Sequence, residues 1–180
     1  MTALFPGQRE DEKICLVIRQ HWFTFAAKFV IWLIFASVLA LFHFAARAYF
    51  SDFINEPYNH VLNLAELIYL MFLVLGLFIM WILYYLNMEI ITNKRIVDIT
   101  QKSLMQHTLS ELNLNRVQDV TAQVHGLLET FLNYGDVHLQ TAGETERFVF
   151  EKVPDPTGVA KLILDLYEAL PPDEKARGGD

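Results

Sequence analysis

Two long apolar runs in the first half of the chain constrain its fold more than any other feature. In residues 29–46 only Ser37 and His43 interrupt the apolar side chains, and residues 67–86 carry no charge. A helix rises about 1.5 Å per residue, so a helical run of this length crosses a hydrocarbon layer of about 30 Å. The sequence therefore predicts a membrane protein whose two transmembrane helices form a hairpin.

The predicted hairpin occupies residues 21–88, with spans at about 24–47 and 63–86, and an N-terminal arm, residues 1–20, precedes it. The connecting loop, residues 48–61, contains no Lys or Arg. Basic residues lie instead before the first span and after the second, at Arg9, Lys13, Arg19, Lys28, Lys94, Arg95 and Lys102. Because basic flanks remain on the cytoplasmic side, we expect a multi-pass protein of the inner (cytoplasmic) membrane with both termini in the cytoplasm.

Aromatic and basic side chains occur near the ends of both predicted spans. Trp and Tyr favour the membrane interface, and Lys and Arg reach it along their apolar stems. The residues that we expect at this interface are Trp22, Lys28, Arg47, Trp81, Tyr84 and Tyr85.

The predicted spans contain His43, Arg47 and Glu66 near their loop-side ends, where an unpaired ionised group is costly. His43 and Arg47 are four residues apart and so share one face of the first helix. Glu66 lies at a similar depth in the second helix. Two interpretations remain open: Glu66 pairs with His43 or Arg47 and fixes the register of the hairpin, or Glu66 extends to the outer headgroups.

Beyond residue 86 the apolar residues recur at every second position, which is typical of half-buried antiparallel strands. The alternating segments include residues 97–100, 119–124, 136–141 and 147–151. A short helix is predicted at 127–132. A final amphipathic helix is predicted from Asp155-Pro156 to Leu170, because Asp is a favourable N-cap and Pro suits the first helical turn. We expect the polar tail, residues 171–180, to be disordered.

The segment Lys13–Arg19 is apolar on both alternating faces. Over so few residues, periodicity cannot distinguish a strand buried on two sides from a helical extension of the first span. We therefore keep both interpretations, and the first would return this segment to the strand-rich domain as an additional strand.

Charge and composition argue against several classes of function. Residues 89–180 contain 9 Lys or Arg against 15 Asp or Glu, a net of −6, which disfavours nucleic acid and anionic lipid. A single cysteine excludes an internal disulfide, and the six histidines show no paired spacing for a metal. No nucleophile motif or phosphate-binding loop is present. We expect no enzyme, cofactor, metal or small-molecule substrate.

Several segments in a fixed order resemble bacterial membrane proteins that carry a pleckstrin-homology-like (PH-like) domain after two spans. The segments that carry the resemblance are Phe5–Gln8, Arg19–Trp22, Asn87–Ile96, Leu114–Val120, Leu132–Val137 and Val153–Pro156. The resemblance implies an α+β fold: a PH-like domain, residues 89–170, formed by a curled antiparallel barrel of about seven strands and capped by the C-terminal helix. At Thr100–Leu104 the chain lacks the glycine that relatives usually carry.

The resemblance implies a membrane-anchored, non-enzymatic interaction or scaffold module at the cytoplasmic face, which binds a protein partner or self-associates. Two alternatives are a homo-oligomeric pore or transport-related assembly and a lipid-headgroup sensor. Lys94 and Arg95 are weak candidates for headgroup contacts, and the acidic domain disfavours them.

Overall fold

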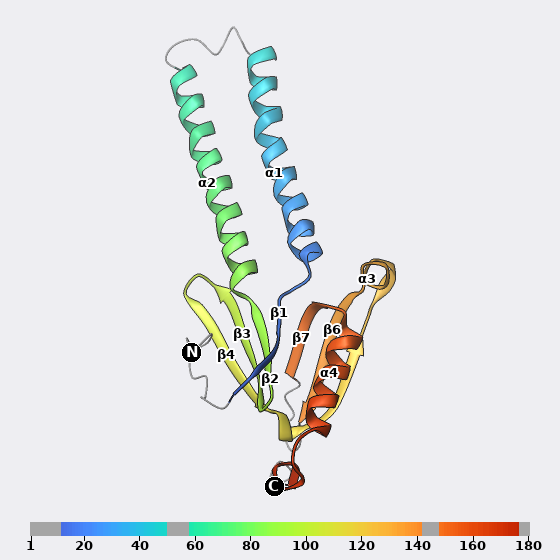
Figure 1. Cartoon of the computed structure of the whole chain (residues 1–180). Coiled ribbons are helices and arrows are strands. Elements are labelled where there is room, and N and C mark those ends of the chain that lie inside the picture. Colours follow the sequence, from blue (N-terminus) through green and yellow to red (C-terminus); the bar gives the residue numbers. More distant parts are fainter. Residues whose placement is uncertain (1–11, 50–57, 142–147, 177–180) are drawn as a thin grey trace. The chain divides into compact units, whose positions relative to one another are not determined.

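The computed structural model describes residues 12–49, 58–141 and 148–176 of the chain (Figure 1). The Phe5–Gln8 segment and most of the connecting loop lie outside the described residues. The chain divides into two compact units. The hairpin unit comprises residues 22–84, and the strand unit comprises residues 1–21 together with 85–180. The described part of the N-terminal segment, residues 12–21, thus belongs to the strand unit.

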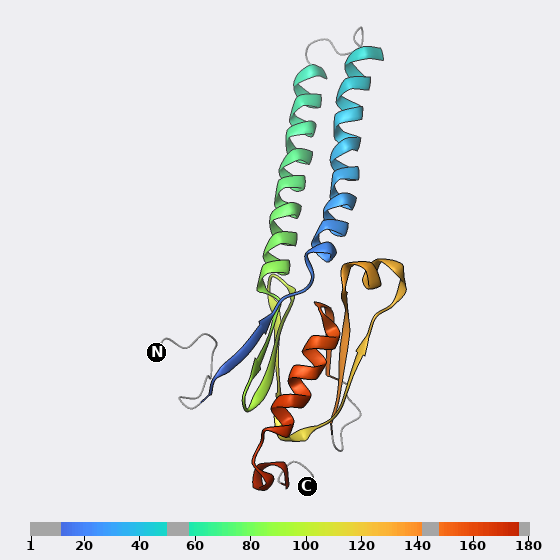
Figure 2. The same ribbon diagram turned by 45° about the vertical axis from the view of Figure 1, so that its right-hand side comes forward.

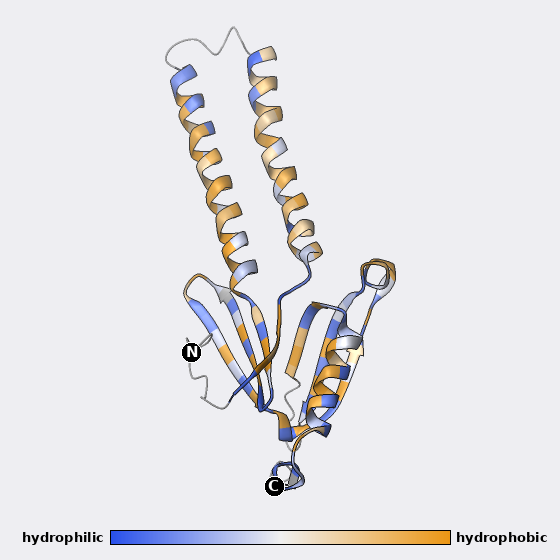
Figure 3. Ribbon diagram, in the orientation of Figure 1, coloured by the Kyte–Doolittle hydropathy of each residue, from blue (hydrophilic) through white to orange (hydrophobic). Residues whose placement is uncertain are grey.

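Two long helices form the hairpin unit, α1 (Trp22–Tyr49) and α2 (Tyr58–Leu86). By length and composition, both can cross a membrane, and apolar residues predominate along them (Figure 3). Neither helix buries a residue against protein, so almost all of their apolar surface must be covered by something else. In water this exposure would be costly, whereas lipid tails cover it without penalty. The predicted pair of apolar helices is confirmed.

The first sheet of the strand unit has the order β1-β2-β3-β4, and all its neighbours are antiparallel. Its strands are β1 (Ile14–Ile18), β2 (Met88–Thr92), β3 (Arg95–Ser103) and β4 (Gln106–Asn113). The strand interpretation of Lys13–Arg19 is therefore confirmed, and the helical extension of the first span is wrong. Because β1 precedes α1 and β2 follows α2, the hairpin is inserted between two paired strands of one sheet.

The second sheet has the order β5-β6-β7 and is also antiparallel. A short 3-10 helix, η1 (Leu114–Arg116), leads into it from the first sheet, and α3 (Gly126–Leu132) connects its first two strands. The strands are β5 (Val117–Gln123), β6 (Tyr134–Thr141) and β7 (Phe148–Pro154). Among the described residues, hydrogen-bonded ladders occur only within each sheet. The strand unit is therefore an open sandwich of seven strands and not a closed barrel.

The C-terminal helix α4 (Pro156–Glu168) begins as predicted, because the Asp155 side chain accepts a hydrogen bond from the Gly158 N–H at 3.2 Å. Figure 2 shows this helix, in red, alongside the three-stranded sheet, where Val159 and Ile163 enter the core. Both sheets and α4 contribute to that core, which comprises Ile18, Ile91, Ile96, Leu112, Leu114, Val117, Val137, Leu139, Phe150, Val153, Val159, Ala160 and Ile163.

The chain beyond α4 differs from the prediction of a disordered tail. Pro172–Ala176 forms a short helix, α5. The Glu174 and Lys175 N–H groups donate to the Pro171 carbonyl, and the Asn115 side chain donates to the Glu174 carbonyl at 3.2 Å. These bonds tie α5 to η1. Residues 177–180 lie outside the described residues.

Candidate functional site

The two attachment points of the hairpin meet on one pair of strands. In the β1–β2 ladder Ile18 is the register partner of Glu89, so the chain leaves and re-enters the sheet at neighbouring positions. Next to this point the His21 N–H donates to the Lys152 carbonyl of β7 at 2.7 Å. The His21 ring stacks on Tyr134, with ring centroids 4.7 Å apart. The exit of the chain toward α1 is therefore held by both sheets.

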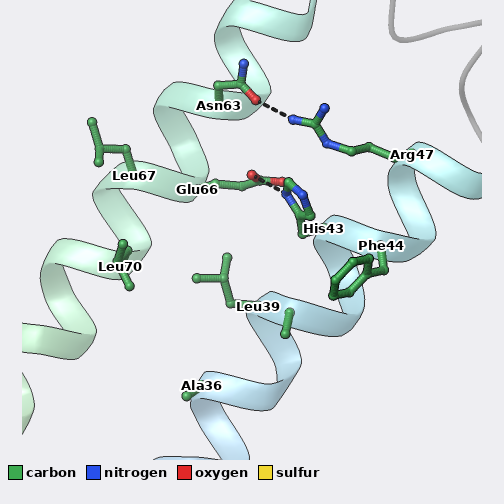
Figure 4. Close-up of a pocket in the computed structure, with 10 residues that line it drawn as sticks. Ala36, Leu39, His43, Phe44, Arg47, Asn63, Glu66, Leu67 and Leu70 are labelled. Atoms are coloured by element: carbon green, nitrogen blue, oxygen red, sulfur yellow. Dashed lines mark hydrogen bonds and ion pairs between the residues drawn. The ribbon is translucent and has the colours of Figure 1, made fainter.

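A polar cluster lies near the loop end of the hairpin unit (Figure 4). His43 Nδ1 is 2.8 Å from Glu66 Oε2, and the Arg47 guanidinium donates to Asn63 Oδ1 at 3.0 Å. The structure thus brings Glu66 to His43 and gives Arg47 a different partner. Asn63 was missed by the sequence analysis, although it lies three residues before Glu66 and so on the same face of α2. The cluster lines a recess of about 450 Å³ whose other walls are mainly apolar.

Two further hydrogen bonds cross the hairpin nearer its middle. The Trp32 indole N–H donates to the Leu73 carbonyl at 2.9 Å, and the Tyr69 hydroxyl donates to the Phe35 carbonyl at 3.1 Å. In an apolar medium these bonds fix the alignment of the two helices, which have no fully buried residue between them.

The residues expected at the membrane interface lie at or near the helix ends. Most have exposed side chains, namely Trp22, Lys28, Arg47, Trp81 and Tyr85. Tyr84 is half-buried and its ring contacts Phe25, with centroids 5.2 Å apart, while the Arg19 guanidinium lies 4.2 Å from the Tyr85 ring centroid. These positions are compatible with an interface, and the interface contacts themselves stay a prediction.

Arg95 has a place that the sequence analysis did not anticipate. It is buried, and its Nε and Nη2 donate to the two carboxylate oxygens of Glu12, each at 2.9 Å. Glu111 accepts a third bond, from Nη1, at 2.5 Å. Hydrogen bonding to Glu12 is the main cause that raises the pKa of Arg95. A buried, fork-shaped ion pair of this kind holds β3 to the segment before β1 and leaves no guanidinium for a headgroup.

The β2–β3 turn follows the end of β2 that is opposite its junction with α2. β2 runs for five residues from Met88, next to α2, to Thr92, just before that turn. At about 3.3 Å per residue, Lys94 and Arg95 are about 15–20 Å from the start of β2. Arg95 is engaged in its ion pair with Glu12, and a headgroup contact of Lys94 stays a prediction.

A second charged cluster joins α3 to β6 and β7. Lys152 Nζ lies 2.8 Å from Glu129 Oε1, and the Lys152 N–H donates to Asp136 Oδ1 at 2.8 Å. The His125 N–H donates to the other oxygen of Glu129 at 2.7 Å. The hydrogen bond from Lys152 lowers the pKa of Glu129, and the same bond raises the pKa of Lys152. The cluster stabilises a non-glycine residue, Lys152, in the left-handed region at φ 54°.

Glu89, the second residue of β2, is 6% exposed and its Oε2 has no hydrogen-bond partner among the described residues. Burial is the main cause that raises the pKa of Glu89, to about 8, and the nearby negative charges of Asp98 and Glu151 add to it. At neutral pH this shift favours the protonated form of the carboxyl.

No metal site is formed by the part of the chain that the structure describes, since no three His, Cys, Asp or Glu side chains there are arranged to hold an ion. The charged clusters join strands and helix termini. Their geometry therefore supports structural roles.

The chain is similar to known proteins of one family. The sequence model of the family described as "Bacterial PH domain" matches residues 23–167. A DUF1696 family protein with a pleckstrin-homology domain from Shewanella loihica PV-4 is similar, with 18% identity, a TM-score of 0.38, and coverage of 45% of this chain and 70% of that chain. A pleckstrin homology domain from Shewanella amazonensis SB2B gives 19% identity, a TM-score of 0.38 and coverage of 45% and 66%. No curated protein matches.

Proposed function

The chain belongs to the bacterial PH domain family, and on that premise we propose that it is a membrane-anchored, non-enzymatic interaction module. Its hairpin holds the strand unit at the cytoplasmic face of the membrane. There the strand unit binds an extended segment of a protein partner or of a second copy of this chain. Fold alone does not fix function, so the proposal rests on the features below.

The observation that carries the proposal is the insertion of the hairpin between β1 and β2. An anchor attached at one end of a domain leaves that domain free to turn about a single linker. Here both ends of the anchor continue into paired strands, with only Arg19–His21 before α1 and Asn87 after α2. The strand unit is thus tethered twice, which suits a rigid docking platform held close to a membrane.

The open sandwich offers sheet edges for docking. β4 is one edge of the first sheet, eight residues long, and its outer backbone groups have no ladder partner among the described strands. Such an edge accepts an extended peptide by strand addition, with alternate side chains contributing specificity. Leu109, in the middle of β4, is exposed and would contact the added strand.

Site-specific photocrosslinking in native membranes tests the proposal. A photoreactive residue in place of Leu109 should give one discrete adduct, either at twice the chain mass or with a single partner. The same residue in place of Glu168, an exposed position on α4, is the matched control and should not give that adduct. Equal labelling patterns at both positions, or no adduct at Leu109, would contradict docking at β4.

A further inference from the structure

The helix α3 has the reverse of the usual surface pattern. Its one charged residue, Glu129, points inward to Lys152 and is buried, whereas three of its four large apolar residues face out. Leu127 is 91% exposed, Phe131 is 87% exposed, and Leu128 is also exposed. A helix in contact with water normally turns its apolar face to the core. The outer face of α3 is therefore apolar, and the rest of the strand unit leaves it uncovered.

A second apolar projection occurs at the turn between β3 and β4. Met105 is 99% exposed and Leu104 beside it is also exposed. We name these five residues, Leu104, Met105, Leu127, Leu128 and Phe131, the apolar rim. Exposed large side chains are common singly, but two separate projections of this kind on one small unit indicate a contact surface.

Both projections lie at the end of the strand unit where the chain joins the spans. The Glu129–Lys152 pair links α3 to β7, and the Lys152 carbonyl accepts a bond from the N–H of His21, which directly precedes α1. At the other projection, the Gln101 N–H donates to Asn87 Oδ1 at 2.6 Å, and Asn87 directly follows α2. Leu104 and Met105 come three and four residues after Gln101. Within the strand unit, Figure 1 shows α3 and the β3–β4 turn at the end where β1 finishes.

We propose that the apolar rim inserts into the lipid interface, so that the strand unit is held against the bilayer at α3 and at the β3–β4 turn. Lipid is the occupant that chain continuity favours. His21 and Asn87 are each one residue from an apolar helix long enough to cross a membrane, so a hairpin that spans the bilayer brings these two residues to its surface. This inference rests on the proposed membrane anchoring.

Charge also distinguishes lipid insertion from electrostatic docking. The strand-rich half of the chain has a net charge of −6, and the outer face of α3 carries no charged side chain. Binding must therefore come from burial of apolar side chains at the headgroup–acyl boundary, at a depth of about 5–10 Å. It should not require anionic lipid and should not weaken with salt.

Lipid quenching in the full chain tests the inference. Cys15, the only cysteine, is replaced by Ser, and single cysteines at Phe131, Met105, Phe72 and Glu168 each carry an environment-sensitive fluorophore. Each variant is placed in phosphatidylcholine nanodiscs that carry acyl-chain quenchers at one of two depths, near the headgroup end or near the bilayer centre, and the stronger quenching of the two is compared. We expect the labels at 131 and 105 to be quenched to within a factor of about two of the span label at 72, with or without high salt. The label at 168 should be unaffected.

The four positions separate the possible results. Met105 touches little else in the strand unit, so a label there leaves folding intact even if the one at 131 does not. Quenching at 72 without quenching at 131 and 105 would overturn lipid insertion alone, whereas no quenching at 72 would overturn the anchoring itself. Quenching that needs anionic lipid, or a spectral change that depends on protein concentration and not on the quencher, would also overturn the inference, in favour of electrostatic docking or self-association.

Discussion

The replacement Glu89→Gln should remove a pH dependence that is built into the first sheet. The carboxyl is 6% exposed, and Glu89 is the cross-strand partner of Asp98. Its pKa is raised from 4.5 to about 8 in the folded protein, chiefly by burial. The folded state therefore binds the proton more tightly than the unfolded state does. This contribution to stability is complete below pH 4.5, is lost as the pH rises from 4.5 to 8, and is absent above that.

The magnitude follows from the size of the shift. At 1.36 kcal/mol per pKa unit, a rise from 4.5 to about 8 corresponds to about 5 kcal/mol of free energy of unfolding lost between those values. Gln is neutral at every pH, but its buried amide adds donors that cost about 1–3 kcal/mol if they are unpaired. At pH 8.5 the Gln variant should therefore be more stable than the wild type by about 3 kcal/mol, or about 10 °C in Tm. At pH 4.5 it should be equally or less stable.

Thermal unfolding of the full chain in nanodiscs, followed by circular dichroism across this pH range, measures the difference between variant and wild type. Glu168→Gln removes an exposed carboxyl from α4 and is the matched control, whose profile should parallel the wild type. A Glu89→Gln profile that also parallels the wild type at every pH would refute the reasoning.

Three further substitutions test separate parts of the fold. Ile18→Ala should cost about 2–4 kcal/mol by chemical unfolding because Ile18 is a core residue of β1, whereas the adjacent exposed Val17→Ala should cost less than about 1 kcal/mol; equal costs would contradict the inward face assigned to β1. Arg95→Ala should cost about 3–5 kcal/mol by leaving the buried Glu12 carboxylate without its counter-ion, whereas Lys161→Ala, at an exposed position of α4, should be nearly neutral; equal costs would contradict the buried ion pair. Glu66→Ala should lower the stability of the hairpin in detergent by about 1 kcal/mol, and an unchanged stability would remove the role of the His43 contact.

The elements that the sequence predicted well are those in which one strong period covers many residues. The two apolar runs could only be long helices, and the stripe at Val159 and Ile163 placed α4 against the sheets. The strand β1 was left open because five residues are too few for periodicity to decide. Its assignment required pairing with Ile90 and Ile91, which lie more than 70 positions later in the chain.

The sequence analysis failed where partners are distant in the chain or where a helix is short. Glu12 and Arg95 are 83 positions apart, so nothing local indicated that Arg95 would be buried in an ion pair. The 127–132 helix was predicted correctly to within one residue, but its apolar residues resemble those of a core helix. Their exposure in the structure and the inward pairing of Glu129 with Lys152 show that most of them face out.

The central claim is that the hairpin crosses the membrane and leaves the strand unit in the cytoplasm. Labelling of single cysteines by a membrane-impermeant maleimide in intact cells tests it most directly, in the background without Cys15. A cysteine at Tyr58, the first residue of α2, should react in intact cells, whereas a cysteine at Glu168 should react only after the membrane is opened. Reaction at 168 in intact cells, or release of the protein from membranes by carbonate, would contradict the account.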